Sequence, residues 1–236
     1  EQLFEVKGVM AAPGAPPFNP GLKPRLGYGR VPGVVTALEL EQALHLEGGA
    51  AGLVKGQDPT EIAFIQCVGS RDKSLGRDYC SRICCGYALR LAHRLVSRCP
   101  ETKITFFYMD IQNFGRDFDR RYNEIKEKVE LIHGIPGEII ASENGRASVP
   151  FLNEASGQRE SRAFDLVVLS QGLGPPEDPV CEILGLPRDE DGFLISLPEK
   201  RLFAVGTAAG PMDLAESKAG AEAAVFRMLE RLGRAV

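Results

Sequence analysis

The sequence predicts an α/β protein built on a parallel β-sheet. Two observations carry this prediction: apolar runs typical of buried strands alternate with amphipathic helical segments, and no internal repeat interrupts them. Parallel strands need a crossover segment between them, which this alternation supplies. Hydrophobic residues form 44% and charged residues 25% of the 236 residues, as in ordinary globular domains. We therefore expect a Rossmann-like, three-layer fold with a parallel sheet covered by helices.

The alternation occupies the middle of the chain. A buried strand is predicted at 62–68, where apolar residues are bounded by polar ones. Residues 80–99 have apolar side chains at helical spacing and arginines on another face, which indicates an amphipathic helix. Turn signals at Asn144-Gly145 and Ser156-Gly157 predict a hairpin over 142–164. The other elements are expected as a strand at 103–111, a polar helix at 116–130, a strand at 131–140 and a buried strand at 164–172.

The flanking segments carry fewer signals. Residues 6–12 form a strand-like run. Thr36 is placed to cap a helix, and Glu39 three residues later completes a capping box. Near the C-terminus, a strand around Phe203 is followed by a Gly-rich turn and a long helix that begins near Asp213.

Four of the six cysteines lie within 19 residues: Cys67, Cys80, Cys84 and Cys85. They begin where the first buried strand ends, which is where a dinucleotide-binding domain has its G-x-G-x-x-G phosphate loop. The chain has no such loop, so we expect this domain not to bind NAD(P)H in the usual way. Adjacent thiolates fit the corners of a [4Fe–4S] cluster more easily than one tetrahedral ion, but a zinc site and free or disulfide-paired cysteines stay open. Cys99 and Cys181 are interpreted as ordinary, partly buried cysteines.

Charge and composition argue against several classes of function. The 28 basic and 32 acidic residues give a net charge of −4, which disfavours nucleic-acid binding. No apolar run is long enough to span a membrane, and the first residues lack the pattern of a signal peptide. We expect a cytoplasmic protein, here a piece of a longer chain, whose clustered cysteines bind metal or take part in redox chemistry.

Six sequence motifs resemble one family of flavoproteins. They are FIQCVGSRD, YCSRICC, FFYMDIQNFGRDFD, DLVVLSQGL, DEDGF and FAVGTAAGPMDLAES, and they run through nearly the whole chain in one register. The family comprises the A subunits of heterodisulfide reductases, together with related flavoprotein subunits of quinone-interacting oxidoreductase complexes. The resemblance implies a thioredoxin-reductase-like arrangement of two domains. Residues 1–57 and 173–236 would form part of an FAD domain, and residues 58–172 a degenerate NAD(P)-type domain.

The same resemblance implies cofactors and the residues that hold them. The four clustered cysteines would ligate a [4Fe–4S] cluster. The residues implied for FAD binding are Gly14, Gly206, Thr207, Gly210, Pro211, Asp213 and Ser217. The sequence lacks the family's N-terminal FAD fingerprint, so we expect the chain to bind FAD weakly or not at all.

The functional hypothesis is an electron-transfer module of a heterodisulfide reductase-like oxidoreductase complex. It would pass electrons between FAD and partner subunits through the [4Fe–4S] cluster. Its expected partners are the other subunits of such a complex or ferredoxin-type electron carriers, and we expect the chain alone to be inactive. The alternative is a non-catalytic Rossmann-like binding module with a structural four-cysteine zinc site.

Overall fold

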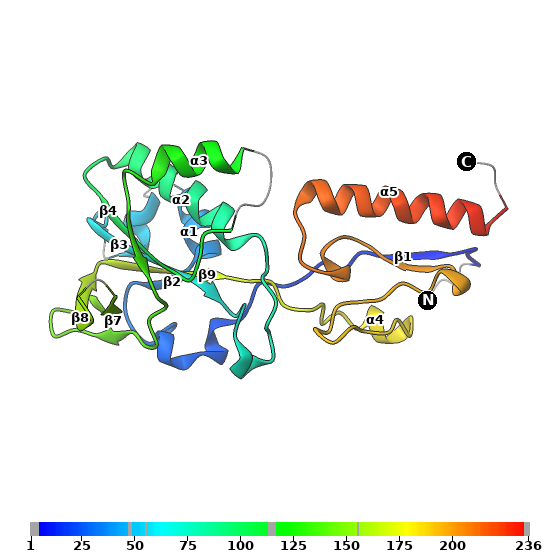
Figure 1. The fold of residues 1–236 in the computed structure, drawn as a ribbon, viewed down its shortest axis with the longest axis horizontal. Helices are drawn as coiled ribbons and strands as arrows, with labels where there is room; N and C mark the ends of the chain where they lie inside the picture. Colours follow the sequence, from blue (N-terminus) through cyan, green and yellow to red (C-terminus); the bar gives the residue numbers. More distant parts are fainter. Residues whose placement is uncertain (1–4, 47–48, 55, 113–116, 155, 234–236) are drawn as a thin grey trace. The chain divides into compact units, whose positions relative to one another are not determined.

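The computed structural model describes residues 5–46, 49–54, 56–112, 117–154 and 156–233. Its contacts divide the chain into two units, and each is formed by separate stretches of sequence (Figure 1). Unit 1 comprises Glu1–Pro17, Arg71–Arg82 and Leu173–Val236, whereas unit 2 comprises Phe18–Ser70 and Ile83–Gly172. None of the helices described is long and apolar enough to cross a membrane.

Unit 2 is organised around a parallel sheet of five strands. The order across the sheet is β2 (Val34–Thr36), β9 (Leu166–Gln171), β3 (Glu61–Val68), β4 (Lys103–Tyr108) and β5 (Glu130–His133), and every neighbouring pair is parallel. The central strands β3 and β9 are buried along almost their whole length, which explains their nearly continuous apolar sequence. The predicted α/β fold with a parallel sheet is therefore confirmed.

Helices cover one face of this sheet. They are α1 (Ala37–Ala43), α2 (Cys84–Arg98) and α3 (Phe118–Ile125), and their apolar side chains share one core with Phe64, Phe106 and Val168 of the sheet. Helix α1 begins at the predicted capping box. Thr36 Oγ1 accepts from the Glu39 N–H at 3.1 Å, and the Glu39 carboxylate accepts from the Thr36 N–H.

The other face is covered by a second sheet rather than by helices. This antiparallel sheet consists of β6 (Ile140–Ala141), β7 (Ala147–Asn153) and β8 (Gln158–Phe164), and β7 and β8 form the predicted hairpin. Phe107 of the parallel sheet contacts the rings of Phe151 and Phe164 at centroid distances of 5.1 and 6.2 Å. Three layers are present as expected, but one outer layer is β-structure.

One prediction about unit 2 is corrected by the structure. Residues 131–140 do not form one strand, because Pro136 and Gly137 separate β5 from β6, which belong to different sheets. The contacts group the chain differently from the domains predicted with a boundary at residue 57, because β2 pairs with β9 and residues 18–57 belong to unit 2. The polar helix expected at 116–130 is present as α3, and Arg116 lies outside the described residues.

Unit 1 contains a two-stranded parallel sheet and a long helix. Strand β1 (Val9–Ala11) pairs with β10 (Leu202–Ala204), and α5 (Leu214–Arg231) packs through Ala224 on Phe203 and Val205. The unit also includes the short helix α4 (Val180–Ile183). Short 3-10 helices complete the two units at Pro20–Leu22, Pro24–Leu26, Gly49–Leu53, Lys73–Leu75, Pro198–Lys200 and Gly206–Ala209.

Gly69 is required where the chain leaves β3. Its φ is +81°, and a Cβ there would lie 2.0 Å from Cγ of the buried Phe18 ring. We expect Gly69→Ala to lower the free energy of unfolding by about 3 kcal/mol, because left-handed strain and overpacking add together. Urea unfolding would measure this loss. The control is Gly29→Ala, which has φ +69° in open space and should cost only about 1 kcal/mol; equal losses would contradict the packing argument.

Asp165 ties the start of β9 to the start of β3. Its Oδ2 accepts from the Thr60 and Glu61 N–H groups, both at 3.0 Å, and Oδ1 lies 2.9 Å from Arg146 Nε. Burial raises the pKa of Asp165, but these hydrogen bonds and Arg146 outweigh it, so the pKa lies below its usual range.

Stability from Asp165 is present above the unfolded pKa and is lost as the pH falls through the lower folded pKa. We therefore expect Asp165→Asn to lower the free energy of unfolding by about 2 kcal/mol at neutral pH and by less below about pH 4. Urea unfolding at both pH values measures the difference. The exposed Glu143→Gln provides the matched control, and a loss at Asp165 that does not change with pH would refute the assignment.

Candidate cofactor sites

Cys67 stands where β3 departs from its neighbour. Ile65 pairs with Leu169 and Val68 with Gln171, so two residues of β3 face one residue of β9 in a bulge. Cys67 has φ +57°, a left-handed conformation that is unfavourable for a residue with a side chain, and it is buried. Strain of this kind is common at functional sites, where the rest of the fold holds the residue in place.

Cys84 and Cys85 open helix α2, which follows in the same unit. Both are buried, and the Cys85 thiol donates to the Asp110 carbonyl at 3.9 Å. A hydrogen bond with Cys84, and then burial, raise the pKa of the Cys85 thiol far above its usual range. The residue before α2, Ile83, offers no side chain that could cap the helix.

The Tyr87 hydroxyl lies near three of the predicted ligands. Its hydroxyl donates to the Gln171 carbonyl at 2.7 Å. Burial, and then the charges of Cys84, Cys85 and Cys67, raise the pKa of this hydroxyl well above its usual range. The three thiols of unit 2 therefore lie near enough to this hydroxyl to affect its pKa, at the carboxyl end of β3, the edge of a parallel sheet where ligands usually bind.

Cys80 belongs to unit 1 with the rest of residues 71–82. Its Sγ accepts from the Arg82 N–H at 3.3 Å. The neighbouring residues anchor the segment within that unit, because the Tyr79 hydroxyl donates to the Leu173 carbonyl at 2.9 Å and the Leu173 N–H donates to Ser81 Oγ at 2.8 Å. Among the residues that the structure describes, no three His, Cys, Asp or Glu side chains converge as ready-made metal ligands. The four-cysteine ligand set therefore stays a prediction.

The chemistry of the donors nevertheless fits an iron–sulfur cluster. None of the six cysteines forms a disulfide, and the three thiols of unit 2 are buried. A cluster binds thiolates, and it would replace the protons that the buried thiols hold. Such a group, when bound, supplies one-electron redox chemistry.

The residues predicted to bind FAD lie in unit 1, at two places. Gly14 follows β1 and Thr207 follows β10, and these strands are parallel neighbours, so both residues lie beyond the same edge. A Cβ on Gly14, whose φ is +78°, would lie 3.7 Å from Thr207 Oγ1. Gly206 also has a left-handed φ, +65°, and opens the turn in which Thr207 lies. Because glycine has no side chain, these two turns would let a phosphate or ribityl group approach the backbone closely.

The second place is the N-terminus of α5. Asp213 caps this helix, since its Oδ1 accepts from the Glu216 N–H at 2.8 Å, and the Ser217 N–H donates to the Asp213 carbonyl at 2.9 Å. The Asp213 carboxylate therefore has a structural role independent of any ligand. Gly210 has φ +147°, which glycine adopts freely, and Pro211 follows it. Together these residues form the positive end of a long helix.

Comparisons with known proteins bear on the family and the fold of the chain. No family model matches the chain. It is 35% identical over 241 residues to the A subunit of H(2):CoB-CoM heterodisulfide,ferredoxin reductase from Methanothermobacter marburgensis, covering 95% of the chain and 37% of that protein. It is also 35% identical over 242 residues to the iron-sulfur A subunit of CoB–CoM heterodisulfide reductase from Methanocaldococcus jannaschii, with the same coverage. The chain is homologous to part of the A subunit of heterodisulfide reductases. It spans little more than a third of the length of these relatives.

Solved structures establish the fold in the same way. Thioredoxin reductase of T. acidophilum superposes with a TM-score of 0.62 at 15% identity, covering 97% of the chain and 67% of that enzyme. Thioredoxin reductase of Lactococcus lactis gives a TM-score of 0.56 at 20% identity, covering 96% and 68%. These identities are too low to transfer an activity. The likeness confirms the thioredoxin-reductase-like α/β fold.

Sequence reasoning missed Gln66, which immediately precedes the first predicted ligand of this heterodisulfide reductase homologue. The residue is fully buried, and neither Nε2 nor Oε1 has a hydrogen-bond partner among the residues described. A buried polar group without a partner costs about 1–3 kcal/mol. The available signal was a glutamine inside an otherwise apolar buried strand.

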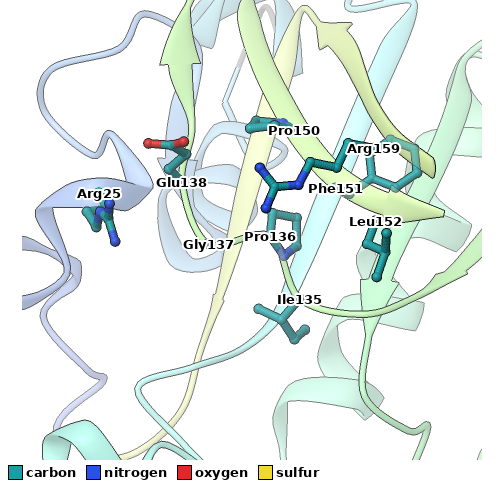
Figure 2. Close-up of a pocket in the computed structure, with 9 residues that line it drawn as sticks. All are labelled: Arg25, Ile135, Pro136, Gly137, Glu138, Pro150, Phe151, Leu152 and Arg159. Atoms are coloured by element: carbon teal, nitrogen blue, oxygen red, sulfur yellow. The ribbon is translucent and has the colours of Figure 1, made fainter. Parts of the chain in front are cut away.

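A hollow on unit 2 carries none of the predicted site residues. Figure 2 shows it beside β7, lined by Pro136, Phe151 and Leu152 with Arg25 and Arg159 at its sides, and its volume is about 290 Å³. Both arginines are exposed, so bulk water already solvates their charges. The hollow is therefore separate from the cysteine site in its residues and in its chemistry.

Arg82 joins the segment of Cys80 to the N-terminus of α5 within unit 1. Its Nη2 lies 2.7 Å from Glu216 Oε1, and Nη1 donates to the Pro211 carbonyl at 3.5 Å. Both side chains of the ion pair are more than a third exposed, so the pair contributes little to global stability.

We expect Arg82→Met to speed amide exchange in residues 71–82 by about fivefold while changing the free energy of unfolding by less than about 1 kcal/mol. Hydrogen–deuterium exchange read by mass spectrometry measures the first effect and urea unfolding the second. Lys218→Met removes an exposed pair with Glu222 on the same helix and should leave the segment unchanged. Unchanged exchange in the Arg82 variant would show that the contact does not hold the segment.

Proposed function

We propose that this chain is an electron-transfer module of a heterodisulfide reductase-like oxidoreductase. In this proposal Cys67, Cys80, Cys84 and Cys85 supply the thiolates of a [4Fe–4S] cluster. The observation that carries it is the burial of three thiols in one unit, with Cys67 at the carboxyl end of β3 and Cys84 and Cys85 at the start of α2, where a related domain would bind a nucleotide. Homology to a protein named as an iron–sulfur subunit supports the same assignment.

Unit 1 contributes part of an FAD site in this proposal. Gly14, Gly206 and Thr207 approach the phosphate or ribityl portion, whereas Gly210, Pro211, Asp213 and Ser217 place the α5 N-terminus near the flavin. Positive N–H groups there would stabilise an anionic reduced flavin. Flavin binding in this chain by itself is expected to be weak, because the sequence has no G-x-G-x-x-G fingerprint.

The protein acts here by burying and positioning its cofactors. Burial of the thiols keeps solvent from the cluster, and the backbone N–H of Gln112 donates a hydrogen bond to Cys85. Electrons would pass to the other subunits of the complex or to a ferredoxin-type carrier. We place the protein in the cytoplasm, where thiols stay reduced; its six free cysteines suit that compartment.

Metal analysis of cysteine variants tests the proposal. Protein purified anaerobically should contain about four iron and four acid-labile sulfide per chain, and replacing any one of the four cysteines by serine should lower both contents severalfold. Cys99→Ser is the matched control, because Cys99 is partly exposed and outside the cluster, and it should keep its iron. Stoichiometric zinc without sulfide would overturn the proposal in favour of a structural metal site.

A further inference from the structure

Gln66 is a buried amide that the proposed function, on which its role here rests, does not yet use. It lies in unit 2, and neither its amide nitrogen nor its amide oxygen has a partner among the described residues. Nearly all buried polar groups in proteins are hydrogen-bonded, so an unpartnered amide points to a partner that is not a protein group. The question is therefore which group this amide meets.

The strand sets the direction of the side chain. Ile62 and Phe64 belong to the core beneath helices α1 and α2, and Gln66 continues this alternation two residues further along β3. Its side chain is thereby directed to the face on which α2 lies. Helix α2 begins there with Cys84 and Cys85, and Cys67 is the next residue of the strand.

No described neighbour accepts a hydrogen bond from the Gln66 amide. The Tyr87 hydroxyl already donates to the Gln171 carbonyl at 2.7 Å, and Gln171 Nε2 donates to the Phe18 carbonyl at 2.6 Å. Tyr87 and Gln171 thus have partners, whereas the Ser170 hydroxyl, which faces Gln66 and Cys67 across the bulge, is buried without a partner among the described residues, as Gln66 is. Thiolate and sulfide sulfurs accept hydrogen bonds readily, and they carry more negative charge after reduction.

We propose that the Gln66 side-chain amide donates a hydrogen bond to a sulfur atom of the cysteine-bound cluster and so raises its reduction potential. A donor at this position stabilises the more negative, reduced state over the oxidised one. Gln66 thus sets the potential without supplying a ligand. This role explains why an amide, rather than an apolar side chain of the same length, occupies a fully buried position.

Spin-echo spectroscopy of the reduced cluster tests the contact directly. The full chain is produced with glutamine labelled with ¹⁵N in its side-chain amide, reduced with dithionite, and checked for iron and sulfide. We expect a ¹⁵N coupling to the cluster that disappears in Gln66→Met, which has a similar length and no N–H. Gln112→Met is the control, because that residue also lies near Cys85 and should retain the coupling.

The same samples give the potential by a redox titration followed by electron paramagnetic resonance. Gln66→Met should lower the ratio of reduced to oxidised cluster at a fixed ambient potential by about tenfold, which is about 59 mV for a one-electron couple. If Gln66→Met fails to hold a cluster, the contact is tested by the ¹⁵N coupling alone. The coupling should then be present in the wild type and retained in Gln112→Met.

The outcomes separate the role of Gln66 from the proposed function. A loaded wild-type protein without ¹⁵N coupling, or an unchanged potential in a loaded Gln66→Met, overturns the role of Gln66 and leaves the electron-transfer proposal standing. A wild-type protein that holds neither iron nor sulfide after anaerobic reconstitution overturns both.

Discussion

Strand β3 leaves the register of β9 after Ile65, and the candidate cysteine site depends on that departure. Cys67, in the bulge, has a left-handed conformation. Gly69 also has a left-handed φ and has no side chain that would clash with Phe18, so the chain can turn away from the sheet there. This happens at the carboxyl edge of a parallel sheet, and the next helix of the unit, α2, begins with Cys84 and Cys85. The position that usually holds a phosphate-binding loop is thus filled with thiols.

The region around this bulge is locally unfavourable for the protein by itself. It combines a left-handed cysteine, a helix that begins without a capping side chain, and a buried amide without a partner among the described residues. The three features lie in β3 and at the start of α2. Concentrated exceptions of this kind are expected where a fold is shaped for a ligand rather than for stability.

Unit 1 shows how structural and functional roles can share residues. Asp213 and Glu216 form a capping box, and Glu216 also pairs with Arg82 two residues after Cys80. The segment of a predicted cluster ligand and the helix of a predicted flavin site are therefore tied together by a single arginine. The parallel pairing of β1 with β10 explains why Gly14 and Thr207, far apart in sequence, lie beyond one edge.

The sequence by itself determined the alternation of strands and helices, the capping box at Thr36, the hairpin and the set of candidate residues, because periodicity, turn residues and caps act over a few positions. It could not determine that β2 joins the main sheet, that residues 131–140 divide between two sheets, or that Cys80 belongs to a different unit from the other three cysteines. Those outcomes depend on pairing between distant segments. Gln66 shows the limit most clearly: its identity was visible in the sequence, but only the packed structure leaves its amide without a partner among the described residues.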